Sequence, residues 1–198
     1  RSHAMRKVLR QRKTSGCVWL EMADNTSPEL VEWLKTSLAL EEDDIFQSTA
    51  PLQLGDWREF YRRQGLDSLR YPPWTPQQNP DIDPMKPMVD IMAAGDTLLS
   101  LPYERFDPVV RMIEEAAEDP ETLGIKMVFY RINAGSPIID ALRKAAHAGK
   151  AVTVLIELKA RFDEANNIEW AARLECNGVQ VIYGIKDLKT HAKICMVV

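Results

Sequence analysis

The sequence predicts an α/β fold in which helices flank a mainly parallel β-sheet. From residue 106 to residue 184, strand-like segments alternate with helical segments of about ten to fifteen residues, which is typical of βαβ units. The segment VTVLIEL at 152–158 is almost continuously apolar, as expected for a strand that is covered on both faces. These two observations place the main sheet in the second half of the chain.

The composition is that of an ordinary globular protein. Of the 198 residues, 45% are hydrophobic and 27% are charged, and the net charge is −4. This charge argues against non-specific nucleic-acid binding, which usually needs a basic domain. No apolar run approaches the ~20 residues that cross a bilayer, and the N-terminus does not resemble a signal peptide. We expect a cytoplasmic protein, with peripheral membrane association left open.

The first 69 residues predict a smaller α/β piece. We interpret residues 1–4 as a remnant of cloning and residues 5–69 as a partial α/β domain. Ser27 and Pro28 suit the N-cap and the first position of a helix. The expected elements are a strand at 17–22, a helix at 27–40, a strand at 45–52 and a helix at 55–66.

Residues 70–87 carry six prolines and few aliphatic side chains. Because proline disfavours both helices and central strands, we expect an extended connector or a loop laid over a surface. This segment is the predicted boundary between the partial domain and a second domain at 88–198.

The second domain should contain the main sheet. Asp107-Pro108 and Ser136-Pro137 mark helix starts, and Gly149 and Gly178 mark helix ends. The expected strands are 96–103, 123–131, 151–161, 179–184 and 189–198, and the expected helices are 106–119, 136–149 and 163–178.

Two of the predicted strands end in arginine, at Arg131 and Arg161. The carboxyl ends of parallel strands meet at the edge of an open sheet where ligands bind. If these strands are neighbours, both guanidinium groups lie at this edge, and their planar forks suit phosphate oxygens. A solvated or carboxylate-paired arginine is the alternative at each position.

The last predicted strand brings a histidine to the same edge. About five residues separate it from the strand at 179–184, which permits a hairpin but not a parallel crossover. We therefore expect an antiparallel strand that starts near the arginines. Side chains alternate across a strand, so one face should carry Lys189, His191, Lys193 and Cys195, and the core face should carry Thr190, Ala192, Ile194 and Met196.

Two lysines beside an imidazole suit phosphate chemistry. Neighbouring positive charge disfavours the imidazolium form of His191, and a neutral imidazole is a nucleophile. Lys189 and Lys193 would attract phosphates and neutralise charge as a phosphoryl group moves. A surface strand with scattered lysines and an incidental histidine is the plainer alternative.

Other positions carry weaker signals. His147 is interpreted as a solvated residue near a helix end. Asp163 and Glu164 resemble a helix N-cap and its first turn, with an arginine-orienting or metal-water role as the alternative. The three cysteines are far apart and odd in number, which favours buried, reduced thiols. The sequence has no GxxxxGK[ST] P-loop, so a nucleotide would be held in another way.

The sequence between residues 106 and 198 closely resembles the first catalytic domain of long-form bacterial polyphosphate kinases. The motifs VTVLIELKARFDE and GVQVIYG followed by LKTHAK are specific to that family. Upstream, SPEL and RYPPWTP resemble the end of its head domain and the joining segment, so the resemblance covers nearly the whole chain after residue 4. It implies a phospholipase-D-like mixed sheet flanked by helices, with 88–198 as a truncated first catalytic domain.

The resemblance also implies a Mg²⁺-dependent, reversible transfer of the ATP γ-phosphate to polyphosphate through a phosphohistidine. His191 matches the nucleophile, and Lys193 completes the HxK pair. Arg131 and Arg161 match arginines at the magnesium and phosphate site. Because arginine is a poor metal ligand, we assign both, with Lys189, to phosphate oxygens and assign no side chain to Mg²⁺ directly. The expected partners are ATP or ADP, polyphosphate and a second catalytic domain, and a homo-oligomer stays open.

Two departures from the family pattern bear on activity, and a third position separates the family from phospholipases. Ser100 and Leu101 stand where the family usually has two histidines, and YRIN replaces a YRTS-like turn. Val198 stands where phospholipase-type HxKxxxxD motifs carry an aspartate, which speaks against a phosphodiesterase. Two alternatives stay open: a phospholipase-D-like phosphodiesterase half-site and a non-catalytic phosphate-binding module. Because the family's site lies between two related domains, we expect this chain to be inactive alone, in the sense that it will not make polyphosphate at a useful rate.

Overall fold

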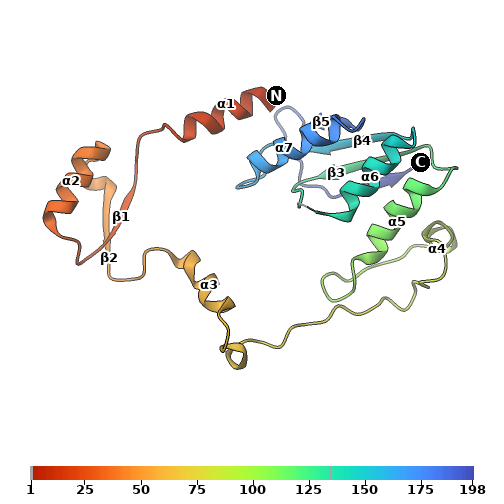
Figure 1. Ribbon diagram of the computed structural model, residues 1–198, viewed down its shortest axis with the longest axis horizontal. Helices are drawn as coiled ribbons and strands as arrows, with labels where there is room; N and C mark the ends of the chain where they lie inside the picture. Colours follow the sequence, from red (N-terminus) through yellow and green to blue (C-terminus); the bar gives the residue numbers. More distant parts are fainter. Residues whose placement is uncertain (1, 134) are drawn as a thin grey trace. The chain divides into compact units, whose positions relative to one another are not determined.

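The computed structural model describes residues 2–133 and 135–198 (Figure 1). Within these residues the chain separates into two compact units, one formed by residues 10–73 and the other by residues 2–9 and 74–198. No helix in the described part of the chain is both long and apolar enough to cross a membrane.

The smaller unit contains a two-stranded parallel sheet. β1 (Leu20–Ala23) pairs with β2 (Ile45–Ser48), and α2 (Pro28–Leu38) connects them. Ser27 caps α2 as predicted, since its hydroxyl accepts a hydrogen bond from the Leu30 N–H at 3.3 Å. The other elements are α3 (Trp57–Arg62) and 3₁₀ turns at Glu42–Asp44, Leu54–Asp56 and Asp67–Leu69. α1 (Ser2–Arg12), at the start of the chain, was not predicted from the sequence.

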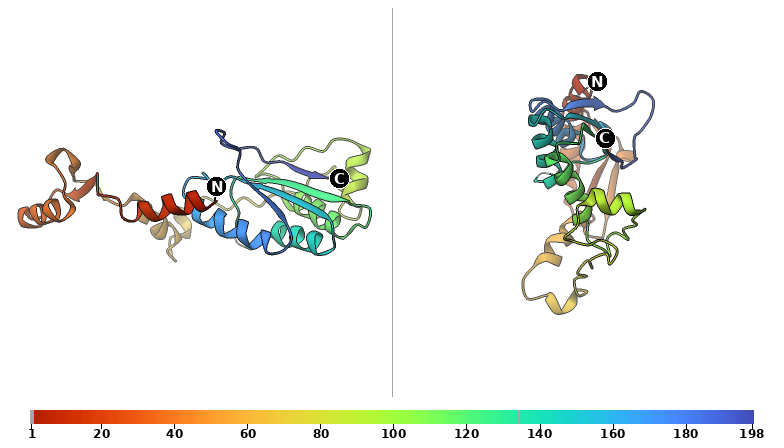
Figure 2. Two further views of the ribbon diagram at one scale, coloured as in Figure 1. Left: turned by 90° about the horizontal axis from the view of Figure 1, so that it is seen from above. Right: turned by 90° about the vertical axis from the view of Figure 1, so that its right-hand side faces the viewer.

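The larger unit is built on a four-stranded sheet in the order β5-β4-β3-β6 (Figure 1). β3 (Gly124–Phe129), β4 (Ala151–Ile156) and β5 (Gln180–Tyr183) are parallel, and β6 (Cys195–Val197) runs antiparallel to β3. α5 (Asp107–Glu118) precedes β3, and α6 (Pro137–His147) and α7 (Glu164–Glu175) connect the parallel strands. α6 and α7 lie on the same face of the sheet (Figure 2). The predicted α/β class with a mixed sheet is confirmed.

The hydrophobic core lies between this sheet and its helices. The largest fully buried side chains are Ile113, Ile125, Leu142, Val154, Ile156, Leu174 and Asn167. Burying an aliphatic side chain of this size contributes about 1.5–3 kcal/mol relative to leaving it exposed. The core therefore provides a rigid support for the loops that leave the strands.

The last strand has the predicted direction but a different length, neighbour and facing. β6 covers three residues and pairs with β3, so it does not form a hairpin with β5. Residues 184–194, which we call the crossing segment, pass over the ends of β4 and β3 without strand structure. Ile194 and Met196, expected in the core, are 57% and 46% exposed, whereas Cys195 and Val197 pack against the core. Strand alternation does not extend through the crossing segment because the chain turns across the sheet there.

Residues 96–103 form no strand, which corrects another prediction. Two of their backbone groups bond to side chains. Asn79 Nδ2 donates to the Leu98 carbonyl oxygen at 2.9 Å, and the Ser100 N–H donates to Glu104 Oε2 at 2.7 Å. A short helix that was not predicted, α4 (Met88–Ala94), precedes them.

The proline-rich residues 74–87 take the second of the two expected forms, a loop laid over a surface. Arg111 of α5 donates hydrogen bonds to the carbonyl oxygens of Asp83, Pro84 and Lys86. Ile82 is buried and forms a small cluster with Met88 and Ile91 of α4. This loop therefore belongs to the packing around α5.

Candidate functional site

The loops that follow β3, β4 and β5, together with the first turn of α7, gather at one edge of the sheet, which we call the carboxyl edge. It consists of residues 130–133, 157–167 and 184–194. β4 was predicted to reach Arg161, but it ends at Ile156. The chain turns there because the Glu157 carboxylate accepts the Lys159 N–H at 2.8 Å. Arg161 consequently lies in the loop and not on the strand.

The Tyr130 ring is the centre of the carboxyl edge. Its centroid lies 4.5 Å from that of the His191 ring, in an edge-to-face arrangement with an interplanar angle of 65°. The Nζ atoms of Lys193 and Lys189 lie 4.8 and 5.7 Å from the Tyr130 centroid, and Arg131 Cζ lies 5.6 Å from it. These distances are within the ~6 Å range of cation–π attraction. The imidazole and three of the predicted cations therefore meet around one aromatic ring.

His191 and Lys193 are in direct contact. Lys193 Nζ lies 3.1 Å from His191 Nδ1, and it also donates to the His191 carbonyl oxygen. Because an ammonium group only donates, Nδ1 is the acceptor in this arrangement. His191 Nε2 makes no hydrogen bond within the described part of the chain. Both side chains are exposed, so an anion in solution could reach them.

Arg131 is oriented by the loop that follows β4. Its Nε lies 2.8 Å from Asp163 Oδ2, and its Nη2 donates to the Arg161 carbonyl oxygen at 3.1 Å. Asp163 stands at the N-cap position of α7 as predicted, but its side chain makes no capping hydrogen bond and pairs with Arg131 instead. The Arg161 guanidinium lies over the Phe162 ring, 5.0 Å from its centroid. Both arginines thus lie at the carboxyl edge, but the contact between them is from the Arg131 side chain to the Arg161 main chain. Their guanidinium groups do not lie side by side as a phosphate clamp.

Asn167 joins the ends of β3 and β4 beneath these cations. Its Nδ2 donates to the carbonyl oxygens of Tyr130 and Glu157 at 2.8 and 3.0 Å, and its Oδ1 accepts the Ile132 N–H at 3.3 Å. Asn167 is fully buried, so these groups have no access to solvent as an alternative partner. The asparagine therefore fixes the backbone that carries Tyr130 and Arg131.

Tyr130 and Asn167 are site residues that the sequence reasoning missed. Tyr130 directly precedes a predicted phosphate-binding arginine, and this position was its sequence signal. Asn167 lies on the same helical face as the buried Ala171 and Leu174, where a polar side chain is unexpected. A polar residue on an apolar face was the signal that could have identified it.

The described residues include no group of three or more His, Cys, Asp or Glu side chains that could hold a metal ion. Asp163 lies in the loop that follows β4, and its Oδ2 is already engaged by Arg131. His147 is exposed at the end of α6, as predicted. The three cysteines are free thiols, but the expectation that they are buried was wrong, since Cys176 is exposed and the other two are only partly buried. The donor set at the carboxyl edge therefore suits an anion better than a protein-bound cation.

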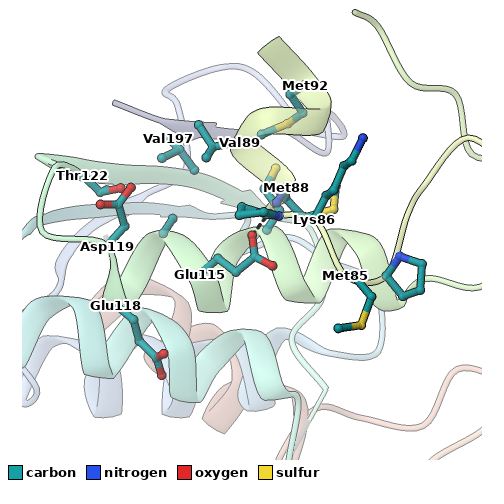
Figure 3. Close-up of a pocket in the computed structure, with 14 residues that line it drawn as sticks. Met85, Lys86, Met88, Val89, Met92, Glu115, Glu118, Asp119, Thr122 and Val197 are labelled. Carbon is teal, nitrogen blue, oxygen red and sulfur yellow. Dashed lines mark hydrogen bonds between the residues drawn. The ribbon is translucent and has the colours of Figure 1, made fainter. Parts of the chain in front are cut away.

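A separate groove of about 710 Å³ is lined by residues of α4, α5 and β6 (Figure 3). Met88 and Met92 of α4, Met112 of α5 and Val197 of β6 contribute to its largely apolar lining. Figure 3 shows the Glu115 carboxylate turned toward Met88, whose N–H it accepts. The groove contains none of the predicted site residues, so the candidate chemistry belongs to the carboxyl edge.

Two protein-family models together match most of the chain. Residues 87–198 match the family described as Polyphosphate kinase C-terminal domain 1, and residues 2–60 match Polyphosphate kinase middle domain. The first of these matches covers more than half of the chain.

Individual relatives give the same result. The polyphosphate kinase of Rhodopirellula baltica is 46% identical over 194 residues, which is 98% of this chain and 23% of the relative. That of Exiguobacterium sibiricum is 45% identical over 195 residues, which is 97% of this chain and 27% of the relative. The crystal structure of polyphosphate kinase from Porphyromonas gingivalis aligns with a TM-score of 0.74 at 27% identity, covering 89% of this chain and 26% of that one. The chain therefore spans about a quarter of the length of these proteins.

Proposed function

The chain belongs to the polyphosphate kinase family, and we propose that it supplies the phosphate-accepting edge of an enzyme that transfers the ATP γ-phosphate reversibly to polyphosphate. The cluster around Tyr130 carries this proposal, because it combines one exposed imidazole with the cations of Lys189, Lys193 and Arg131. An imidazole among cations can serve both as a phosphate-binding group and as a nucleophile.

In the first step, the lone pair of His191 Nε2 attacks the γ-phosphorus of ATP. The bond between this phosphorus and the β,γ-bridging oxygen breaks, a bond from Nε2 to phosphorus forms, and ADP leaves with the bonding electrons. Nε2 holds a lone pair only when the ring proton is on Nδ1. Lys193 must therefore leave Nδ1 as the phosphate arrives, and the ring then changes tautomer through water, with Nε2 releasing its proton and Nδ1 taking one up. The phosphate oxygens offer its ammonium a stronger, charge-assisted partner.

In the second step, a terminal oxygen of polyphosphate attacks the phosphorus on His191. The bond from Nε2 to phosphorus breaks, the electron pair returns to the ring, and polyphosphate is one phosphate longer. Reversal of both steps returns the phosphoryl group to ADP. Lys189, Lys193 and Arg131 would neutralise the charge that spreads over the phosphate oxygens in both steps, with Arg131 held in place by Asp163.

Arg161 is proposed as a further phosphate ligand at this edge. Its guanidinium is exposed and lies over the Phe162 ring, a contact that water or phosphate oxygens can replace. Rotation of its side chain would turn the guanidinium toward an anion that is already bound by Arg131.

Mg²⁺ is proposed as part of the substrate, the magnesium complex of ATP. Magnesium commonly keeps several waters and binds through substrate phosphates with only one or two carboxylates. The described residues do not form a protein cage for this ion, and Asp163 is paired with Arg131. When bound to the phosphates, the ion would lower their negative charge before the attack by His191.

Phosphoryl labelling tests this function. The chain is incubated with γ-labelled ATP or with labelled polyphosphate, and acid-labile, base-stable label is measured in the wild type and in His191→Ala. Labelling needs only the first transfer and no synthesis of polyphosphate, so we expect label in the wild type and none in His191→Ala. Turnover of a phosphodiester without ATP would favour a phospholipase-D-like half-site, and polyphosphate binding without label would favour a non-catalytic phosphate-binding module.

A further inference from the structure

We propose that Glu157 is a positioning residue that holds the crossing segment so that His191 faces the phosphate site. This inference rests on the proposed role of His191 and concerns a buried acid that takes no part in the transfer described above. Glu157 directly follows β4 and is only 2% exposed.

Both oxygens of the Glu157 carboxylate accept backbone hydrogen bonds. Oε1 accepts the Lys159 N–H at 2.8 Å, within the loop that leads to Arg161. Oε2 accepts the Thr190 N–H at 2.6 Å, from the residue that directly precedes His191. One side chain thus connects the arginine-bearing loop to the histidine-bearing segment.

Glu157 is itself fixed to the sheet. Its N–H donates to the Phe129 carbonyl oxygen at 3.0 Å, and its own carbonyl oxygen accepts from Asn167 Nδ2 at 3.0 Å. A carboxylate held at the end of a core strand is a rigid reference point, because its backbone moves only with β3 and β4. The position of Thr190 is therefore set relative to Tyr130, which follows Phe129.

The crossing segment depends on this tether because it lacks strand structure. Backbone N–H groups connect it to the sheet at its two ends, where Gly184 donates to the Ile156 carbonyl oxygen at 3.0 Å and the Val128 N–H donates to the Ile194 carbonyl oxygen at 2.9 Å. The bond from Thr190 to Glu157 lies between these ends. Without it, several residues on either side of His191 would gain backbone freedom, which lowers the fraction of time in which the imidazole is aligned for attack.

A buried carboxylate at this position is costly for folding, which argues that its acceptor oxygens are used. Burial of a charged group is unfavourable unless hydrogen bonds compensate it. An apolar residue would fill the same volume at the end of β4 but would accept neither N–H. Glutamine keeps the shape but replaces one oxygen with an NH₂ group, so it can accept only one of the two N–H groups.

Chemical phosphorylation with potassium phosphoramidate tests this inference in the 198-residue chain. The reagent transfers its phosphoryl group to imidazole and releases ammonia, so it needs no nucleotide. Mass spectrometry then gives separate rates for His191 and His147 in the same molecules. His147 is exposed at the far end of α6 and serves as an internal reference.

We expect His191 to react faster than His147 in the unsubstituted chain. Glu157→Gln should lower the His191 rate at least ~10-fold without changing the His147 rate, because misplacement of a reacting group by about 1 Å costs up to ~100-fold. Glu169→Gln, at an exposed residue of α7 that pairs with Arg173, is the control and should change neither rate. A folded Glu157→Gln variant with an unchanged ratio of the two rates would overturn the inference. Equal rates for the two histidines in the unsubstituted chain would instead overturn the proposed role of His191, and the inference with it.

Amide hydrogen exchange keeps the inference testable if Glu157→Gln does not fold. In the unsubstituted chain, the Thr190 N–H should exchange at least ~10-fold more slowly than the N–H groups of Lys189 and His191. Equal exchange at these three positions would show that the tether does not hold the crossing segment, and it would contradict the inference without affecting the test of His191 itself.

Discussion

Replacement of Tyr130 by leucine should slow phosphoryl transfer to His191 by about 30-fold. The ring contacts three cations at 4.8 to 5.7 Å and the His191 ring at 4.5 Å. Exposed cation–π contacts contribute about 0.5–1 kcal/mol each, and an aromatic edge-to-face contact contributes about 0.5–1.5 kcal/mol. Because the cations are exposed, we take the lower value of each range, about 0.5 kcal/mol for each of the three cation contacts and for the ring contact. The leucine variant then loses about 2 kcal/mol of the energy that orients these groups, which corresponds to about 30-fold in rate.

The matched variant is Tyr130→Phe. It keeps the ring face and should stay within about twofold of the wild-type rate. The assay is the phosphoramidate reaction at His191, with His147 as the reference in the same molecules. If the leucine variant reacts at the wild-type rate while remaining folded, the ring does not organise the carboxyl edge. An equal loss in the phenylalanine variant would show that the hydroxyl group is responsible, which also contradicts this account.

Three further results follow from the same geometry. Asn167→Ala leaves buried backbone groups without partners and should lower the free energy of unfolding, measured by urea titration, by about 3 kcal/mol. The control Asn177→Ala removes more exposed hydrogen bonds and should lower it by less than about 1 kcal/mol. Equal losses in the two variants would contradict the buried network. Lys193→Met should reduce label transfer from ATP or polyphosphate to His191 by about 100-fold, and an unchanged rate would exclude its role in charge neutralisation. Burial raises the pKa of the Cys195 thiol, so less of it is thiolate at pH 8. Alkylation by iodoacetamide should therefore be slower at Cys195 than at the exposed Cys176, and the Cys195 rate should rise as the pH is raised. Faster reaction at Cys195 would contradict the burial.

The parallel strands and their helices could be predicted because their patterns are local. A continuous apolar run such as that of β4 and glycine ends such as Gly149 identify an element without knowledge of its neighbours. The antiparallel direction of β6 also followed from the short connection. Its pairing with β3 could not be predicted in this way. A short connection does not tell whether the chain turns back beside β5 or crosses the ends of β4 and β3 to pair on the other side of the sheet.

The candidate site shows the same division between local and long-range information. His191, Lys193 and Arg131 were identified from strand ends and spacing, and the structure brings them together. Their common contact, Tyr130, and the connection from Glu157 to Thr190 join residues that are far apart in the chain. The predicted facing of Ile194 and Met196 was wrong for a related reason. Side chains alternate along β6, but the preceding crossing segment is not a strand, so the facing expected for His191 could not be extended to β6.

Titration of the isotopically labelled chain with inorganic tripolyphosphate, followed by NMR, tests the central claim most directly, because it needs neither nucleotide nor a further domain. The account predicts that the largest shift changes occur at Tyr130, Arg131 and residues 189–193, and that they weaken as salt is raised. Changes centred on the methionine groove between α4 and α5, or changes that leave the His191 ring unaffected, would contradict a phosphate site at the carboxyl edge.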